Sequence, residues 1–237
     1  MNPLVRRAFN LAVPRTGLAS AVDGKYGQPL RGIETPGLFT DHQSLYLAAY
    51  NALPNPVNPN LPEARKLIAA AHASGKTVTI AILQSLTSDT VGATLQQVGQ
   101  SIGINVKIAK LTPAAFGNES YSGKCPRTYD ALVNYWNPDY PAPSAEIVPP
   151  LASLFSNVSC YMSPKFNQLR TAWTATPNGS VAQANATIAM LKQVTADDVY
   201  VPMYVDPLVQ IQPANLHGYT QTQVFVYQDF PDQVSFR

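Results

Sequence analysis

A tryptophan and an aspartate, Trp136 and Asp139, share a proline-rich loop in the stretch TYDALVNYWNPDYPAPSAE (residues 128–146). If this loop borders a cleft, the indole would supply flat apolar area and the carboxylate would pair with an ammonium group of a ligand. The neighbouring prolines would hold this wall in place before the ligand arrives. The alternative is structural: a tryptophan in the core and an aspartate that fixes a turn. Residue types alone lean toward the structural alternative.

The same loop could also supply a carboxylate pair like that of a hydrolase. Asp139 and Glu146 are two carboxylates close in sequence, which is what a glycosidase requires. Glu146 is expected to begin a helix, however, where the helix dipole favours a carboxylate, so the simpler interpretation is a capping role. No GxSxG motif is present, and the glycines form no phosphate-binding loop. Asp197 and Asp198 end another expected helix and are expected to face solvent.

Metal and disulfide chemistry have few candidates. The histidines, His42, His72 and His217, are not spaced as metal ligands, and we expect neither a metal nor another cofactor. Two cysteines are too few for a zinc site. Cys125 precedes the strand expected at residues 129–135, and Cys160 follows the helix that returns from the far end of that strand. They could therefore form one bridge, worth about 3–4 kcal/mol on the chain-entropy model, or remain two separate buried thiols.

The residues before the loop predict a strand–helix–strand unit. The runs KTVTIAIL (76–83) and NVKIAKL (105–111) are typical of strands. Between them, apolar residues recur at helical spacing, at Val91, Leu95, Val98 and Ile102. Two strands connected in this way are parallel, with a right-handed crossover. The Trp136 loop would leave the carboxyl end of the next strand, which is where ligands gather in parallel α/β sheets.

Other helices are expected on both sides of this unit. Helical spacing of apolar residues predicts one that Pro14 ends, and another that Asn60 caps and Gly75 ends. Residues 17–59 are expected to run over a surface, with a short helix near residues 42–53. Further helices are expected at residues 112–117, 166–173 and 181–191. Strands are expected within residues 199–211 and 222–228. The whole chain is α/β and is expected to form one domain.

The composition limits the classes of partner. Only 13% of the residues are charged and the net charge is +2, so no basic stripe is available for nucleic acid. No apolar run is long enough to span a bilayer. The first residues do not resemble a signal peptide, because Arg6, Arg7 and Asn10 interrupt their short apolar run. By itself the sequence is typical of a cytosolic chain or of a piece of a longer protein.

The strongest signal is the order of passages along the chain. They are VRRAFNLAVPR (5–15), NPNLPEARKLIAAAHASGKTVTIAIL (58–83), LQQVGQSIGINVKIAKLTPAAF (95–116), TYDALVNYWNPDYPAPSAEI (128–147), MSPKFNQLRTAW (162–173) and VPMYVDPLVQIQPANLHGYTQ (201–221). In this order they resemble passages of the bacterial extracytoplasmic peptide-binding proteins of ABC transporters, the oligopeptide- and dipeptide-binding family (family 5). Each motif is loose alone, but the series covers nearly the whole chain.

The resemblance implies a fold and a function. The fold would be a periplasmic-binding-protein-like lobe, with a βαβ core and a mixed sheet flanked by helices. The function would be capture of a peptide or a similar amine-bearing solute for delivery to a membrane permease, with no chemistry performed on the ligand. Asp139 would pair with the α-ammonium group of the peptide and Trp136 would line the cleft, with Tyr135 and Tyr140 shaping the same wall.

The sequence departs from the family pattern in two ways. Pro14 stands where the family usually has an aspartate, which changes the end of the first helix. The large N-terminal lobe of the family is also missing. Residues 1–237 would then be the second lobe alone, and residues 200–237 would lead back toward the first. Such a lobe is expected to work outside the cytoplasm, in the periplasm or as a cell-surface lipoprotein, and to bind ligand weakly without its partner lobe. The alternatives left open are a small hydrolase that uses Asp139 and Glu146, and a protein-interaction module.

Overall fold

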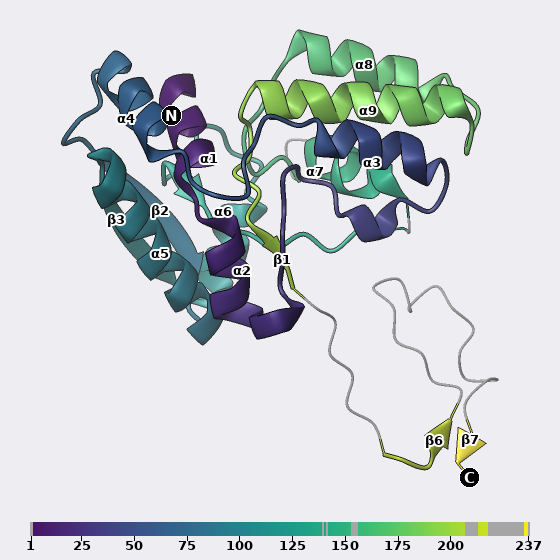
Figure 1. The fold of residues 1–237 in the computed structure, drawn as a ribbon, viewed down its shortest axis with the longest axis horizontal. Coiled ribbons are helices and arrows are strands. Elements are labelled where there is room, and N and C mark those ends of the chain that lie inside the picture. The colour runs from purple at the N-terminus through teal and green to yellow at the C-terminus, as the bar shows by residue number, and fades with distance from the viewer. Residues whose placement is uncertain are drawn as a thin grey trace.

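The computed structural model of this protein describes residues 2–138, 140, 142–152, 156–206, 213–217 and 235–236. Within these residues, most helices and strands gather into two parts that lie side by side, and the short strands at Leu216–His217 and Ser235–Phe236 lie apart from both (Figure 1). One part is a parallel sheet covered by helices, and the other consists mainly of helices. The α/β class expected from the sequence is confirmed.

The larger sheet contains parallel strands in the order β3–β2–β4. β2 (Thr77–Leu83) pairs along its whole length with β3 (Asn105–Leu111), and α5 (Leu86–Ile102) connects the two. This is the strand–helix–strand unit that the sequence pattern predicted. β4 (Ala131–Leu132) pairs with the other edge of β2, but only two residues of the strand expected at 129–135 take part.

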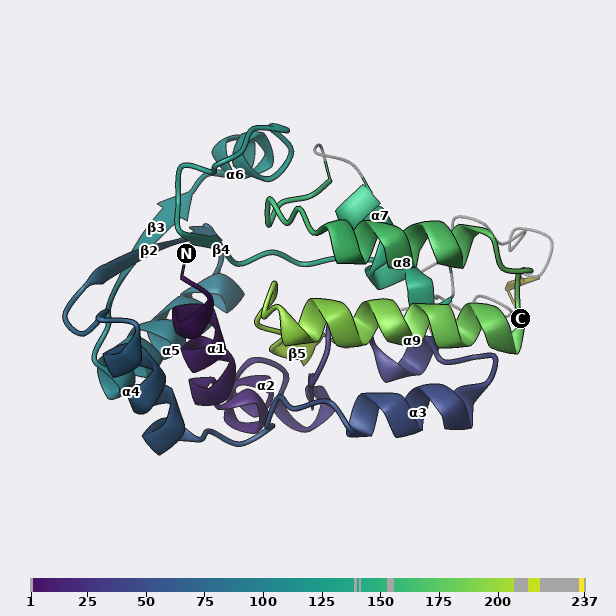
Figure 2. The same cartoon turned by 90° about the horizontal axis from the view of Figure 1, so that it is seen from above.

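Helices cover both faces of this sheet (Figure 2). On one side lie α1 (Pro3–Ala12), α2 (Arg15–Asp23), α4 (Leu61–Ala70) and α5, and on the other side lies α6 (Pro113–Ser120). The helices of the first group and the sheet enclose a cluster of buried apolar side chains that we call the first core. It includes Val5, Phe9, Ile68, Ile80 and Val91.

Two expectations for this part were wrong. α2 occupies residues that were expected to be irregular, because Leu18 and Ala19 are buried and this tertiary burial outweighs the low helix propensity of Gly17. α4 begins at Asn60 as predicted, with the Asn60 side chain accepting a hydrogen bond from the Glu63 backbone N–H. It ends at Ala70, however, and Gly75 adopts its positive φ of 74° in the turn that follows.

The helical part contains α3 (Gln43–Asn51), α7 (Val148–Ala152), α8 (Pro164–Thr174) and α9 (Val181–Ala196). Single turns of 3-10 helix at Gly24–Tyr26, Pro36–Leu38 and Pro143–Glu146 join the longer elements. The second core lies between these helices. It includes Phe39, Tyr50, Ile147, Phe166, Met190 and Leu191.

Short antiparallel pairs complete the described structure. β1 (Gln28–Pro29) pairs with β5 (Tyr204–Val205), and β6 (Leu216–His217) pairs with β7 (Ser235–Phe236). Parallel and antiparallel pairing are thus both present, but in separate sheets. Of the strand expected within residues 199–211, only β5 is seen, because residues 199–203 form no strand. Residues 207–211 and the strand expected at 222–228 lie outside the described residues.

A polar joint connects the two parts at α1. The Arg6 guanidinium donates to the backbone carbonyls of Asp197 and Asp198, just beyond α9, at 2.8 and 2.9 Å. The carboxylate of Asp198 accepts from Asn10 Nδ2 at 2.9 Å and from Arg7 Nη1 at 3.3 Å. Asp198 is therefore buried, and the expectation that it faces solvent was wrong, because cationic and amide groups from α1 replace its hydration.

Arg15 is the fully buried centre of the same joint. Its Nε donates to the carbonyl of Pro202 at 2.7 Å, and Nη1 donates to the carbonyls of Asn10 and Pro56, each at 2.7 Å. Nη2 donates to Asn10 Oδ1 at 2.9 Å. One side chain thereby ties α1, the chain before α4 and the segment after α9 together.

Candidate functional site

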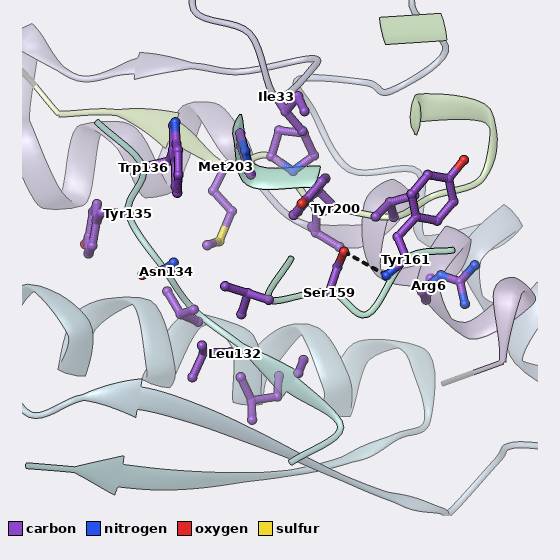
Figure 3. Close-up of a pocket in the computed structure, with 18 of the residues that line it drawn as sticks. Arg6, Ile33, Leu132, Asn134, Tyr135, Trp136, Ser159, Tyr161, Tyr200 and Met203 are labelled. Carbon is purple, nitrogen blue, oxygen red and sulfur yellow. Dashed lines mark hydrogen bonds between the residues drawn. The ribbon is translucent and has the colours of Figure 1, made fainter. Parts of the chain in front are cut away.

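A cavity of about 790 Å³ lies between the two parts. Its walls come from the loop after β4, from residues 156–162, from residues 198–206 and from the loop at residues 30–35 (Figure 3). The cavity is within the range of 300–1,000 Å³ that is typical of small-ligand sites. The β4 loop leaves the carboxyl end of a parallel strand, where the sequence analysis expected a ligand wall.

Trp136 is one of the residues that line the cavity. Its indole N–H donates to the backbone carbonyl of Ala145 at 3.1 Å, and the side chain is half-buried. The hydrogen bond fixes the ring while leaving part of its surface toward the cavity, which gives the apolar wall that a ligand can pack against.

Tyr135 lies beside Trp136 in the same wall. Its hydroxyl is 2.8 Å from the hydroxyl of Tyr204, and the rings meet edge to face. Burial raises the pKa of Tyr135, so the phenol stays neutral and can hydrogen-bond at physiological pH. Tyr140 does not line this cavity; its hydroxyl is 3.2 Å from Ser144 Oγ. Asp139 lies outside the described residues, so its predicted pairing with an ammonium group stays a prediction.

Glu146 does not cap a helix, and that interpretation was wrong. It ends the 3-10 turn Pro143–Glu146, and its carboxylate accepts from the backbone N–H of Thr35 and, at 2.7 Å, from Thr35 Oγ1. Burial raises the pKa of Glu146 to about 7, although the bonds from Thr35 act in the opposite direction. Glu146 lines the cavity, although Glu146 and Thr35 are 111 residues apart in the sequence. Only tertiary packing produces this arrangement.

Glu34, the residue before Thr35, is fully buried behind this contact. Neither of its carboxyl oxygens has a hydrogen-bond partner in the part of the chain that the structure describes. Burial raises the pKa of Glu34 well above its ordinary value, and the neighbouring charge of Glu146 raises it further. Nothing in the sequence marked Glu34, because its neighbours Ile33 and Pro36 are equally compatible with a surface loop.

Residues outside the quoted loop complete the cavity. Tyr161, Tyr200 and Met203 line it opposite β4. The Tyr161 hydroxyl donates to Asp197 Oδ2 at 2.5 Å, and burial raises the pKa of Tyr161 to about 12. No sequence pattern pointed to these residues, since each contributes from a segment far along the chain from residue 136.

A disulfide joins Cys125 and Cys160 at one end of the cavity, with an S–S distance of 2.08 Å. The bond is one of the two alternatives that the sequence left open. Arg127 reinforces it by donating to the backbone carbonyls of Asn157, Val158 and Glu119 at 3.0, 3.1 and 2.9 Å. The bond and the guanidinium hold the start of the β4 segment against residues 157–160.

Two negative findings apply to the described residues. They contain no group of three or more His, Cys, Asp or Glu side chains placed to hold a metal ion. None of their helices combines the length and the apolar character needed to cross a membrane.

Solved structures with the same fold include several bound to peptides. The periplasmic binding protein DppA from Helicobacter pylori, in complex with the peptide STSA, matches 99% of this chain with a TM-score of 0.77 and 22% identity. The dipeptide-binding protein from Pseudoalteromonas sp. SM9913, in complex with Met-Leu, matches 86% with a TM-score of 0.71 and 19% identity. OppA from Haemophilus influenzae, in complex with RPPGFSPFR, matches 86% with a TM-score of 0.69 and 19% identity.

The lengths of these proteins differ from that of this chain. The chain spans 44% of the DppA chain and 39% of each of the other two. No curated protein matched the sequence. The model of one family, described as bacterial extracellular solute-binding proteins, family 5 Middle, matches residues 1–154. With this match over most of its length, the chain belongs to the family 5 bacterial extracellular solute-binding proteins.

Proposed function

We propose that this chain is the second lobe of the substrate-binding component of an ABC importer. It captures peptides or similar amine-bearing solutes and does no chemistry on them. The observation that carries the proposal is the cavity of about 790 Å³ at the carboxyl end of β4, in a chain that belongs to solute-binding family 5. The peptide complexes of DppA and OppA, which share this fold, support a peptide as the ligand.

The geometry of the cavity fits capture better than catalysis. Tyr135 and Trp136 supply aromatic area that hydrogen bonds hold in place, so little side-chain freedom is lost when a ligand binds. Asp139, three residues after Trp136, would pair with the α-ammonium group of the peptide. Tyr140 would support this loop from outside the cavity.

The partners follow from the same proposal. A first lobe, encoded before residue 1, would close over the cavity, and residues 200–237 would lead back toward it. A membrane permease would receive the ligand. The protein would work outside the cytoplasm, as the family description states for its members. Because half of the cleft is missing, this chain alone should bind peptides more weakly than the gene product at its full encoded length.

Titration calorimetry with tripeptides tests the proposal. The full-length gene product should bind at least one member of a tripeptide panel, and Trp136→Ala should weaken that binding about 10- to 100-fold, which corresponds to about 1–3 kcal/mol of lost packing. The matched control is Tyr26→Ala, which removes a solvent-exposed aromatic ring outside the cavity and should leave binding unchanged. Absence of binding to every peptide, or equal effects of the two substitutions, would refute the proposal.

Asp139→Asn separates the three classes of function that the sequence left open. In a peptide-binding lobe it weakens capture, because the carboxamide carries no charge to pair with the ammonium group. In a hydrolase that uses Asp139 and Glu146 it abolishes turnover of the substrate. In a module that only contacts another protein, Asp139→Asn changes neither peptide capture nor turnover. Peptide hydrolysis by the wild-type protein would contradict the proposed function directly.

A further inference from the structure

The carboxyl groups of Glu34 and Glu146 form a buried acidic pair that has no cationic partner in the described part of the chain. Glu34 is 0% exposed and Glu146 is 8% exposed. Buried carboxylates in proteins are normally paired with a cation or a metal ion. Among the described residues, the groups bonded to the pair are the backbone N–H and the hydroxyl of Thr35, which hold Glu146, while no described group bonds either oxygen of Glu34.

The groups packed around the pair offer no positive charge either. Tyr50 of α3 faces Glu146, and Tyr46 of the same helix faces Glu34; both are neutral phenols whose pKa values burial raises. Arg31, the nearest cation along the chain, donates its Nη1 to the carbonyl of Asn55 at 3.2 Å. Glu34 therefore stays protonated, and Glu146 has no cationic partner among the described residues whenever it ionises.

The cavity is the route by which a positive charge can reach Glu146. Thr35 and Glu146 line the cavity, whereas Glu34 lies behind them. The indole of Trp136 is anchored to Ala145, the residue before Glu146, so the aromatic face and the carboxylate border the same part of the wall. An indole beside a carboxylate is a favourable environment for a guanidinium or alkylammonium group, which can contact the ring and the anion together.

Arg6 and Arg127 are the cations among the described residues that line the cavity, and neither forms an ion pair with Glu146. Arg6 donates to the carbonyls of Asp197 and Asp198, and Arg127 donates to those of Glu119, Asn157 and Val158. Asp206 also lines the cavity, and burial and the bond from Asp23 raise the pKa of Asp206 to about 6. The other acidic residues among the described residues that line the cavity are Glu119, Asp130 and Asp198.

We infer that Glu146, backed by Glu34 and flanked by Trp136, is a specificity-determining subsite that selects ligands carrying a second basic group, such as a lysine or arginine side chain. The inference rests on the proposed function, since it assigns a ligand class to the same cavity. It is distinct from the predicted role of Asp139, which concerns the α-ammonium group that every peptide has.

Binding of a basic side chain at this subsite should release protons, and that release can be measured. With a pKa of about 7, Glu146 is about half protonated at pH 7 in the free protein. A cation bound beside the carboxylate stabilises the ionised form, so binding a lysine side chain should release about half a proton at pH 7. An uncharged side chain of the same size should release none.

The experiment compares trialanine peptides in which lysine or norleucine replaces each alanine in turn, using the gene product at its full encoded length. Calorimetry at pH 7.5 should show that, at one position, the lysine peptide binds at least tenfold more tightly than its norleucine counterpart. Glu146→Gln should remove this difference between the two peptides. The control Glu63→Gln, which removes a carboxylate from α4 on the surface, should preserve the preference.

Proton release is measured on the wild-type protein in two buffers of different ionisation enthalpy, so this arm needs no variant to fold. Release of about half a proton with lysine and none with norleucine supports the inference. Norleucine peptides that bind without any lysine preference, a preference that survives Glu146→Gln, or equal proton release by both peptides would overturn it while leaving the proposed function intact. If no peptide binds at all, the proposed function itself fails, and the subsite fails with it.

Discussion

A residue's role in this protein depends on what the fold brings beside it, and Glu146 is the clearest case. The sequence predicts that Glu146 is a carboxylate at the start of a helix. In the structure, Thr35 bonds both of its oxygens, and Glu34 lies next to it. Trp136, in contrast, was predicted to line a cleft from its place after the carboxyl end of a parallel strand and from the family resemblance, although its residue type alone favoured a core position. The sequence therefore located one wall of the cavity and misjudged the chemistry of another.

The buried pair predicts an unusual dependence of stability on pH. Burial raises the pKa of Glu146 from 4.5 to about 7, so its contribution is fully present below pH 4.5 and is lost as pH rises through about 7. The loss amounts to on the order of 3 kcal/mol. Glu146→Gln cannot ionise, so its free energy of unfolding should fall less than that of wild type between pH 4 and pH 8. Urea denaturation at these two pH values measures the difference.

Glu63→Gln serves as the control for this measurement as well. Glu63 is on the surface, in an ion pair with Lys66, and its loss should shift stability by less than about 0.5 kcal/mol at either pH. Parallel pH profiles for wild type and Glu146→Gln would show that Glu146 is as free to ionise in the folded protein as in the unfolded chain.

At the scale of elements, regular spacing of apolar residues was enough to predict most of the fold. β2, α5 and β3 lie where the β-branched runs and the four-three-four spacing indicated, and α8 and α9 were predicted from their apolar spacing. α3 lies near the short helix expected at residues 42–53. α2 was missed because its sequence, RTGLASAVD, has only a short apolar stripe. Its burial against α5 and β1 is a tertiary effect that no local pattern records.

Close packing between α5 and β3 depends on Gly99. A Cβ atom at this position would lie 2.8 Å from the carbonyl oxygen of Ile104 and would also collide with the side chain of Val106. Gly99→Ala should therefore destabilise the protein by about 1–3 kcal/mol, although alanine is the better helix former. The matched control is Gly117→Ala in α6, where a Cβ atom has nothing within 4 Å and the substitution should stabilise by up to about 1 kcal/mol.

Chemical denaturation of the two variants side by side separates packing from helix propensity. Opposite signs of the change in unfolding free energy are the expected result. If both substitutions stabilise the protein, α5 does not lie as close to the end of β3 as the structure has it.

At the scale of the whole molecule, two hydrophobic cores share one polar joint. The sequence predicted one domain and gave no indication of the joint, because its contacts link residues far apart in the chain, such as Arg15 with Pro202. The buried Arg15 side chain shows which distant segments the joint holds together. Burial lowers the pKa of Arg15 to about 10, so the guanidinium stays charged at neutral pH and depends on its bonds to backbone carbonyls.

The joint predicts how the two cores unfold relative to each other. Arg15→Met leaves the carbonyls of Asn10, Pro56 and Pro202 without their buried donor, so it should destabilise the protein by about 3–5 kcal/mol. Because those carbonyls belong to segments from both parts, the variant should also unfold in two steps where wild type unfolds in one. Far-UV circular dichroism reports all the helices. In a Trp136→Phe background, fluorescence reports Trp173, which packs against the second core.

The control for this prediction is Arg65→Met, which removes an exposed guanidinium of α4 that donates to the carbonyl of Ser101 at 2.7 Å. It should change stability by less than about 1 kcal/mol and leave the two signals coincident. In Arg15→Met the fluorescence and circular dichroism curves should separate along the urea axis, since each core then melts according to its own contacts. Coincident curves in Arg15→Met would mean that other contacts already couple the cores, and that the arginine contributes stability without cooperativity.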